Sequence, residues 1–231
     1  MKIFLHIKNF IKAFRMKYSA KYSDKVVSKY WSTAPATHSN TDQEHFAFYA
    51  REINKLIRKY IDRDDIKLLD HGAGEGSISL QMQAIEPKYS ISASEKFEKY
   101  RTIMQEKGLN VYDAEKLPNG AFDAIFFNCA FYYIHPSKWK SEIKRILAAV
   151  KQGGYLFLTD VPTTQKMHVL LEGYSPLKQL ILWFIWRITT IYQIELGGYF
   201  VDEKQIKQWF PQTIVESLWC PYRSAFVIRR M

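Results

Sequence analysis

The sequence predicts an α/β fold: a mostly parallel sheet with helices on both faces and an antiparallel pair of strands at its C-terminal end. Five short apolar runs between residues 66 and 161 alternate with helix-like stretches, a pattern typical of βαβ units and a parallel sheet. Two more runs, 213–219 and 224–230, are joined by a segment too short for a crossover helix. These two runs therefore predict an antiparallel hairpin.

The elements expected before and within the sheet follow from the same patterns. The five strands are expected at residues 66–71, 88–94, 108–113, 122–128 and 154–160, and the clearest helix between them at 136–150. Upstream, residues 3–18 and 45–60 follow a helical period. The turn-rich segment 31–42 predicts a loop between these helices.

Residues 162–211 separate the fifth strand from the hairpin and are more than one crossover helix needs. They predict a helical cap insertion on the substrate side. One helix is expected over 177–196, stopped by Gly197 and Gly198. A second is expected to begin at Asp202, because Asp202 with Gln205 forms a capping-box pattern and Val201 with Ile206 a hydrophobic staple.

The net charge of +10 is concentrated at one end of the chain. Residues 1–30 hold eight basic residues against one acid, Asp24. Within them, residues 3–18 form a basic amphipathic helix with Lys8, Lys12 and Arg15 opposite its apolar face. Such a helix either contacts an anionic membrane surface or packs on its own domain with its lysines in solvent, and the sequence leaves both alternatives open.

Composition excludes several classes of protein. A hydrophobic fraction of 47% excludes a disordered chain. Cys129 and Cys220 show no disulfide or zinc spacing, so no metal is expected and a reduced cytoplasmic setting is favoured. His6 and Lys8 interrupt any signal-peptide core, and the apolar run 180–186 is too short to span a bilayer. The expected location is cytoplasmic, or peripheral at the inner face of the membrane.

The stretch "LLDHGAGEGSISL", residues 68–80, places Gly72, Gly74 and Gly76 on alternate positions after Asp70. This G-x-G-x-G spacing differs from the G-x-G-x-x-G fingerprint of dinucleotide-binding proteins. Glycines let the backbone approach a ligand closely. An acid at the end of the next strand, such as Glu95, can accept hydrogen bonds from both hydroxyls of a ribose.

Asp70-x-Gly72-x-Gly74-x-Gly76 resembles motif I of the class I S-adenosylmethionine-dependent methyltransferases. The segment 122–160 is similar throughout to the fourth strand, helix and fifth strand of the small-molecule enzymes of this class. The resemblance implies a Rossmann-like seven-stranded sheet and S-adenosylmethionine as the cofactor. It also implies a methyltransferase domain at 61–231, with the cap at 162–211, preceded by a basic helical segment and lid at 1–60.

The resemblance implies roles for individual residues. Glu95 would bind the ribose hydroxyls, and Asp113 would reach the adenine amino group with Ala114 nearby. Tyr30, next to Trp31, would close over the carboxylate end of the cofactor, with core packing as the alternative. The residues expected to bind the cofactor are Tyr30, Asp70, Gly72, Ala73, Gly74, Glu95, Lys96, Asp113, Ala114 and Asn128.

Methyl transfer depends mainly on alignment of the reactants, but a hydroxyl acceptor also needs a general base. Among six histidines, His38 is the first candidate for this base, with a solvated loop histidine as the alternative. Asn128 begins "NCAF", which lacks both prolines of the N-P-P-Y motif of enzymes that methylate DNA amino groups. This difference argues against base methylation.

The expected reaction is O-methylation of a small molecule or of a glycan- or lipid-linked acceptor, in bacterial surface polysaccharide or in quinone or lipid biosynthesis. Residues 1–18 are the candidate contact with an anionic membrane. Two other functions stay open: an RNA methyltransferase, which the charge of +10 suggests, and a non-catalytic partner protein that binds the cofactor. Most of the charge lies in one arm, so nucleic acid is not expected as a partner.

Overall fold

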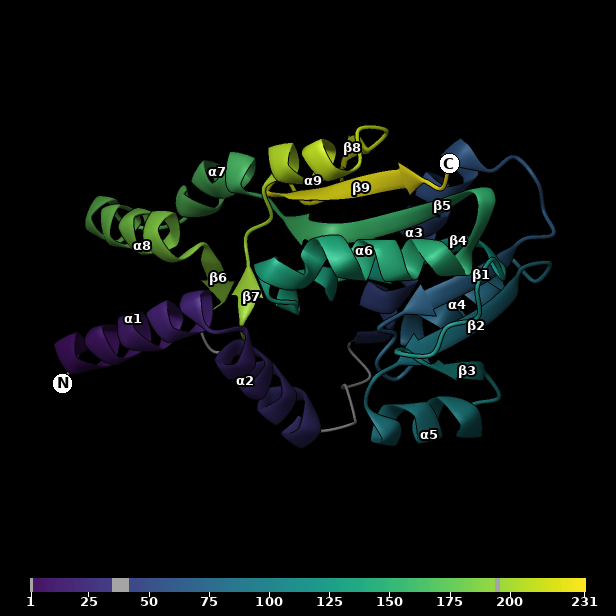
Figure 1. Ribbon diagram of the computed structural model, residues 1–231, viewed down its shortest axis with the longest axis horizontal. Coiled ribbons are helices and arrows are strands. Elements are labelled where there is room, and N and C mark those ends of the chain that lie inside the picture. The colour runs from purple at the N-terminus through teal and green to yellow at the C-terminus, as the bar shows by residue number, and fades with distance from the viewer. Residues whose placement is uncertain (1, 35–41, 194–195) are drawn as a thin grey trace.

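The computed structural model describes residues 2–34, 42–193 and 196–231. A seven-stranded sheet crosses the molecule in the order β3-β2-β1-β4-β5-β9-β8 (Figure 1). Only β9 runs against its neighbours, β5 and β8, while β1 to β5 pair in parallel. The strands are β1 Lys67–His71, β2 Ser90–Glu95, β3 Asn110–Asp113, β4 Phe122–Asn128, β5 Val150–Pro162, β8 Ile214–Ser217 and β9 Arg223–Arg229. The predicted mostly parallel sheet with a C-terminal antiparallel hairpin is confirmed.

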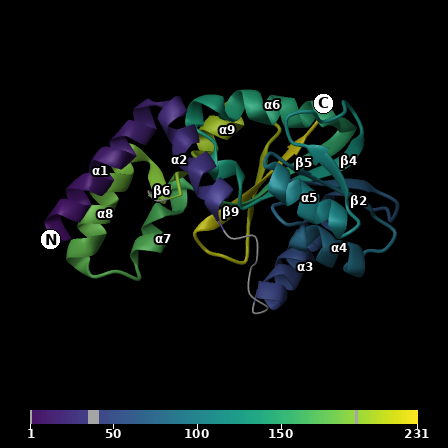
Figure 2. The ribbon, with the colours of Figure 1, turned by 90° about the horizontal axis from the view of Figure 1, so that it is seen from below.

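Helices cover both faces of the sheet, as predicted. Successive strand residues point to opposite faces, so Leu68 and Phe126 enter one core while Leu69 and Ile125 enter the other. Helices α3 Asp42–Tyr60 and α4 Ser77–Ile85 lie over the first face, and α6 Trp139–Ala149 and α9 Glu203–Trp209 over the second (Figure 2). All seven residues of β4 are buried, as expected for a central strand covered on both sides.

Shorter helices complete the domain. Helix α5 Glu98–Glu106 packs on β2 and β3. Three short 3-10 helices, η1 Phe131–Tyr133, η2 Pro136–Lys138 and η3 Thr164–Lys166, follow β4 and β5. They lie close to the carboxyl ends of these two strands, where parallel sheets place their ligand sites.

Two helices precede the sheet region. Helix α1 Lys2–Tyr18 confirms the helix expected at 3–18, and α2 Ala20–Thr33 follows directly. Ser19 caps α2, because its side chain accepts a hydrogen bond from the Tyr22 N–H at 3.2 Å. Residues 31–33, expected in a loop, are instead the last turn of α2, where the Ser32 and Thr33 hydroxyls donate to the Lys29 carbonyl at 3.0 and 2.8 Å.

The predicted cap insertion, residues 162–211, combines helices with a small hairpin. It contains α7 Met167–Leu171, α8 Pro176–Thr189 and a small hairpin of β6 Ile191–Gln193 and β7 Gly198–Tyr199. The predicted helix over 177–196 is wrong in its end, because α8 stops at Thr189 and Thr190 adopts a left-handed conformation with φ of 58°. Thr189, Thr190 and Ile191 are three successive β-branched residues, which favour extended backbone over helix. The start of α9 is confirmed: the Asp202 side chain accepts from the Lys204 N–H at 3.0 Å.

The chain enters and leaves the insertion through neighbouring, hydrogen-bonded residues. Thr163 and Val201 form an isolated parallel bridge. The Thr164 N–H donates to the Val201 carbonyl at 3.0 Å, and the Val201 N–H donates to the Pro162 carbonyl at 2.9 Å. Residues 164–200 therefore form a loop that is closed at its base by backbone hydrogen bonds.

Helices α1 and α2 pack on this insertion. The buried Tyr199 hydroxyl lies 3.1 Å from the Met16 carbonyl and 2.8 Å from the Ser23 hydroxyl. A Cβ at Gly197 would lie 2.7 Å from Val27, so only glycine permits this close approach. The N-terminal helices and the cap are thus one packed unit.

Candidate active site

A cavity of about 760 Å³ opens at the carboxyl ends of β1, β2 and β4, beneath α2 and the start of α3. Its volume is in the range of pockets that bind cofactors and small substrates. Of the residues predicted to bind the cofactor, eight line it: Asp70, Gly72, Ala73, Gly74, Glu95, Lys96, Ala114 and Asn128. Tyr30 and Asp113 are described but are not among the lining residues.

The glycine loop joins β1 to α4 and borders this cavity. Gly72, Gly74 and Gly76 all have left-handed backbone, with φ of 69°, 57° and 76°. A Cβ would lie 2.7 Å from Phe127 at Gly72 and 2.6 Å from Leu109 at Gly76, whereas at Gly74 it would meet nothing within 4 Å. Gly72 and Gly76 are therefore needed for packing, because neighbouring side chains leave no room for a Cβ at these positions. The backbone of Gly74 borders open space, so a ligand can approach it.

Glu95 ends β2 and is buried against the loop. One carboxylate oxygen accepts from the Gly74 N–H at 3.0 Å, and the other accepts from the N–H groups of Lys96 and Phe97 at 2.7 and 3.1 Å. A carboxylate offers about four acceptor positions, so these three donors leave capacity for another donor from the cavity. A ribose hydroxyl is a donor of this kind.

Asp70, the last buried acid before the loop, differs from Glu95 in its surroundings. Its Oδ2 accepts from the Ser79 hydroxyl at 2.7 Å. Burial raises the pKa of Asp70 to about 7; the nearby charge of Glu95 adds to the rise, and the Ser79 hydrogen bond opposes it. The carboxyl group is therefore protonated over a wider pH range than an exposed aspartate.

The third strand contributes backbone and small side chains to the cavity. Ala114 and Glu115 line it, and the Asp113 carboxylate accepts from the Glu115 N–H at 2.9 Å, which shapes the turn after β3. Lys96 is exposed and lies 3.4 Å from the Glu115 carboxylate. Arg145 donates to the Ala114 carbonyl at 2.6 Å and holds this turn against α6.

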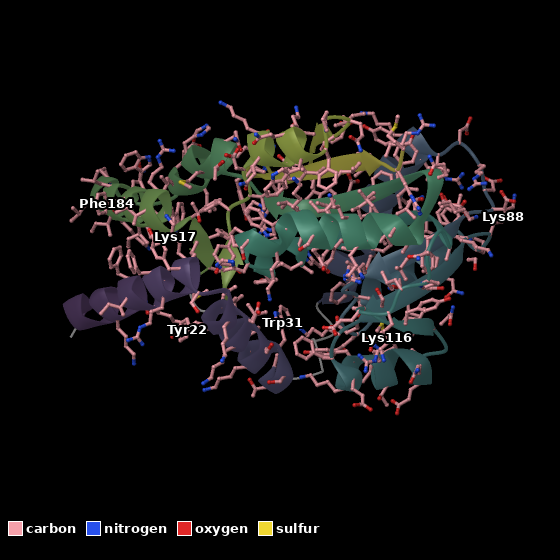
Figure 3. All side chains as sticks on the ribbon, in the orientation of Figure 1. Lys17, Tyr22, Trp31, Lys88, Lys116 and Phe184 are labelled. Atoms are coloured by element: carbon pink, nitrogen blue, oxygen red, sulfur yellow. The ribbon has the colours of Figure 1, made fainter. Side chains whose placement is uncertain are left out.

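An aromatic wall faces the glycine loop. Trp31 extends from α2 toward the sheet (Figure 3) and lies 5.6 Å from the Tyr133 ring, edge to face. The Tyr133 hydroxyl donates to the Gln193 side chain at 3.1 Å, which ties the wall to the cap. Tyr30 is exposed and meets Trp31 edge to face with centroids 5.2 Å apart, and Trp31 is the ring of this pair that lines the cavity.

A cluster of four side chains lies where β4 and β5 end; we call Tyr49, Cys129, Asp160 and Arg223 the polar cluster. Asp160 Oδ2 accepts from the Cys129 thiol at 2.6 Å and from the Tyr49 hydroxyl at 3.3 Å. Arg223 Nη1 lies 3.4 Å from the same oxygen and donates to the Asp160 carbonyl at 2.7 Å. Tyr49 and Cys129 line the cavity, so the cluster links the cavity to a buried ion pair.

The polar cluster is strained and closely packed. Cys129 and Asp160 are non-glycine residues with φ of 54° and 56°, and each such conformation costs about 1–3 kcal/mol and is common at functional sites. Burial, together with the charge of Asp160, raises the pKa of Cys129 and of Tyr49, so both stay protonated. The Arg223 guanidinium lies 5.3 Å from the rings of Tyr132, Tyr192 and Tyr222.

The described histidines serve mostly structural contacts. His71 is buried, with Nδ1 2.7 Å from the Ser94 hydroxyl and Nε2 3.8 Å from Glu142. Burial alone would raise the pKa of Glu142, but the neighbouring His71 and Arg145 side chains lower it to about 2. His45 lines the cavity with its ring 4.4 Å from Tyr49. His38, the predicted base, lies outside the described residues.

A family model described as a methyltransferase domain matches residues 41–213, which include the glycine loop, Glu95 and most of the polar cluster. The chain belongs to this family. It is therefore an S-adenosylmethionine-dependent methyltransferase, as the glycine loop predicts. No curated protein sequence matches it.

Solved structures share the fold of this methyltransferase at low sequence identity. The PH0226 protein from Pyrococcus horikoshii has 14% identity and a TM-score of 0.62, covering 88% of this chain and 99% of its own. A SAM-dependent methyltransferase from Leishmania major has 14% identity and a TM-score of 0.65, with 93% and 86% covered. Magnesium protoporphyrin IX methyltransferase from Synechocystis has 13% identity and a TM-score of 0.59, with 90% and 100% covered. These likenesses confirm the Rossmann-like methyltransferase fold.

Proposed function

We propose that this methyltransferase binds S-adenosylmethionine in the 760 Å³ cavity and transfers its methyl group to a hydroxyl of a small-molecule or a glycan- or lipid-linked acceptor. The observation that carries the proposal is the pairing of Gly74 with Glu95. Gly74 borders open space, and its N–H holds a buried carboxylate that has capacity for another donor. The Synechocystis relative is named for magnesium protoporphyrin IX, an acceptor of the small-molecule kind.

The proposal assigns the cofactor-binding roles to residues of this chain. Glu95 accepts from the ribose, and Gly72, Ala73 and Gly74 offer backbone to the amino acid and adenosine parts beside Asp70. Ala114 and Asp113 lie at the adenine end, with Lys96 and Asn128 as further lining and Tyr30 supporting Trp31 at the lid. Bound S-adenosylmethionine supplies a methyl group activated by its sulfonium.

The polar cluster supports O-methylation. A hydroxyl acceptor must lose a proton, and Tyr49 is the cavity residue whose hydroxyl already donates to a carboxylate, Asp160. In the proposed relay the acceptor O–H bond breaks and its proton passes to the Tyr49 oxygen, while the Tyr49 proton passes to Asp160. No tyrosinate forms, in keeping with the raised pKa of Tyr49 that burial causes. His38 stays a second candidate for the base.

We also propose that the enzyme meets its acceptor at a membrane surface. Residues 1–18 would contact an anionic membrane, which would place a cytoplasmic enzyme peripherally at the inner face of the membrane. In support, Ile11, Phe14 and Tyr18 of α1 are exposed although Ala13 and Met16 pack on the domain. This arrangement suits an acceptor in lipid, quinone or surface-polysaccharide biosynthesis.

Two variants separate cofactor binding from transfer. Calorimetric titration with S-adenosylmethionine should give binding that Glu95→Ala weakens at least about tenfold, because about 1.4 kcal/mol or more is lost with the carboxylate. Tyr49→Phe should bind the cofactor like the wild type and yet transfer labelled methyl to extract components about a hundredfold more slowly.

Glu106→Ala, on the exposed face of α5, is the matched control and should leave both measurements unchanged. Wild-type protein that binds NAD and not S-adenosylmethionine would refute the cofactor site. Normal transfer by Tyr49→Phe would refute the relay while leaving the cofactor site intact.

A further inference from the structure

Helix α8 presents an apolar face to solvent. Trp186 and Thr189 are buried against the cap, whereas Leu177, Leu180 and Phe184 are 71%, 64% and 56% exposed. The exposed residues, with Ile181, follow the i, i+3, i+4, i+7 spacing of one helix face. Contiguous exposed apolar residues of this kind mark an interaction site in a soluble domain.

Helix α1 adds a second exposed stripe beside α8. Ile11, Phe14 and Tyr18 recur at steps of three and four and are 49%, 45% and 66% exposed. The two helices lie side by side at the end of the molecule far from β3 (Figures 1 and 2). Lys17 of α1 donates to the Ile188 carbonyl near the end of α8, which fixes one helix against the other. Phe184 lies on the outer part of α8, away from the sheet (Figure 3).

We call this pair of stripes the helix-pair surface; its large apolar residues are Ile11, Phe14, Tyr18, Leu177, Leu180, Ile181, Trp183 and Phe184. Its charge has a single sign. No acidic residue occurs in residues 1–23 or 173–194, and the exposed basic residues Lys8, Arg15, Lys178 and Arg187 lie on the same two helices as the apolar side chains.

The basic side chains are placed next to aromatic rings. Lys178 Nζ lies 4.1 Å from the centre of the Tyr174 ring, and the Arg187 guanidinium lies 5.7 Å from that of Trp183. Long basic side chains beside Trp and Tyr are typical of helices at the boundary between lipid headgroups and acyl chains. The charge therefore indicates an anionic occupant with an apolar interior.

A second copy of the chain fits this surface less well than a bilayer does. In a two-fold dimer the same surface would face itself, which would bring basic residues together without an acid between them. An anionic bilayer offers negative headgroups for the basic residues and acyl chains for the apolar ones. Within the described residues, no helix is long and apolar enough to cross a membrane, so contact would be along the surface.

We propose that α8 is the main element that inserts into an anionic lipid bilayer, with α1 as the auxiliary one. This inference goes beyond membrane contact through residues 1–18, and it does not depend on methyl transfer. Docking by α8 would also set the cavity beside the bilayer, because the hairpin that follows α8 holds Tyr133 of the aromatic wall through Gln193.

Co-sedimentation with vesicles tests the proposal. The full chain is mixed with vesicles of equal parts phosphatidylglycerol and phosphatidylcholine, and separately with pure phosphatidylcholine vesicles. The wild type should sediment with the anionic vesicles and less with the neutral ones. The triple variant Leu177→Gln, Leu180→Gln, Phe184→Gln should lower the partition coefficient at least about tenfold, since three large apolar side chains no longer enter the acyl region.

Two further variants keep the test specific. Ile11→Gln with Phe14→Gln and Tyr18→Gln should lower binding less than the α8 variant does. Ile85→Gln with Ile214→Gln changes exposed apolar residues elsewhere on the molecule and should leave binding unchanged. Thermal melting checks that each variant is folded.

Three outcomes would overturn the inference. The first is a wild type that stays in the supernatant with anionic vesicles. The second is an α8 variant that sediments like the wild type or no worse than the α1 variant. The third is a wild-type dimer, seen by sedimentation equilibrium, that the α8 variant converts to monomer, which would show that a second copy covers the surface.

Discussion

The two sides of the cavity are built in different ways. The side that we propose for the cofactor, from β1 to β3, depends on backbone: glycines with left-handed φ and N–H groups that hold Glu95. The opposite side depends on side chains from distant segments, among them Tyr49, Asp160 and Arg223. The glycine-loop side thus depends on local geometry, whereas the opposite side depends on side chains that only the fold brings together.

The sharpest test of this comparison is Arg223→Gln. It leaves Asp160 buried without its cation, and removal of one partner of a buried ion pair destabilises proteins by about 3–5 kcal/mol. Urea unfolding gives the free energy of unfolding. Arg229→Gln is the matched control, because it replaces an exposed arginine on the same strand and should cost less than about 1 kcal/mol. If both variants lost the same free energy of unfolding, the buried ion pair of the polar cluster would not be the stabilising contact that we infer.

On the cofactor side, Asp70 should make stability depend on pH. Its folded pKa of about 7 lies above its ordinary value of 3.8, so between these pH values the folded state binds more protons than the unfolded state. Stability should therefore fall as the pH rises through this window, by up to about 1.4 kcal/mol per pH unit, and level off above it. Asp70→Asn has no proton to release and should lose this slope in urea unfolding of the ligand-free protein. Parallel pH profiles for the two proteins would refute the assignment.

Two alanine substitutions within the glycine loop should differ from each other. Gly76→Ala combines left-handed strain with a Cβ only 2.6 Å from Leu109 and should cost about 2–4 kcal/mol. Gly74→Ala meets nothing within 4 Å and should cost about 1–2 kcal/mol, from strain alone. Its Cβ enters the cavity, however, so calorimetry should show the larger loss of cofactor binding for Gly74→Ala. If either measurement gave the reverse order, the two glycines would not have the different roles that we assign to them.

The sequence predicts which residues meet on the glycine-loop side of the cavity, because the elements of this side are local. The strand runs, Asp70, the three glycines and Glu95 recur at spacings that the chain itself displays, and the structure brings eight of the expected residues to one cavity. The antiparallel hairpin could also be predicted from the sequence, because the connection between its two strands is too short to contain a crossover helix.

Sequence reasoning misses most of the side that we propose for the acceptor, and the reason is physical. Tyr49, Asp160 and Arg223 come from α3, β5 and β9, Cys129 follows β4 directly, and no spacing along the chain relates the four residues. The sequence offers one signal: Cys129 directly follows one predicted strand, and Asp160 ends another. Helix α8 was predicted to run through residue 196 because its apolar residues continue past Thr189, where tertiary pairing of β6 with β7 overrides the helical period.

The closed base of the cap has a consequence for evolution. Because Thr163 and Val201 already form a bridge, the ends of residues 164–200 stay together whatever the segment between them contains. A longer, shorter or unrelated segment can be exchanged there by recombination without changing the hydrogen-bonding register of the central sheet. Such an exchange would leave the glycine loop and Glu95 in place, so the residues that we propose for binding the methyl donor would stay the same.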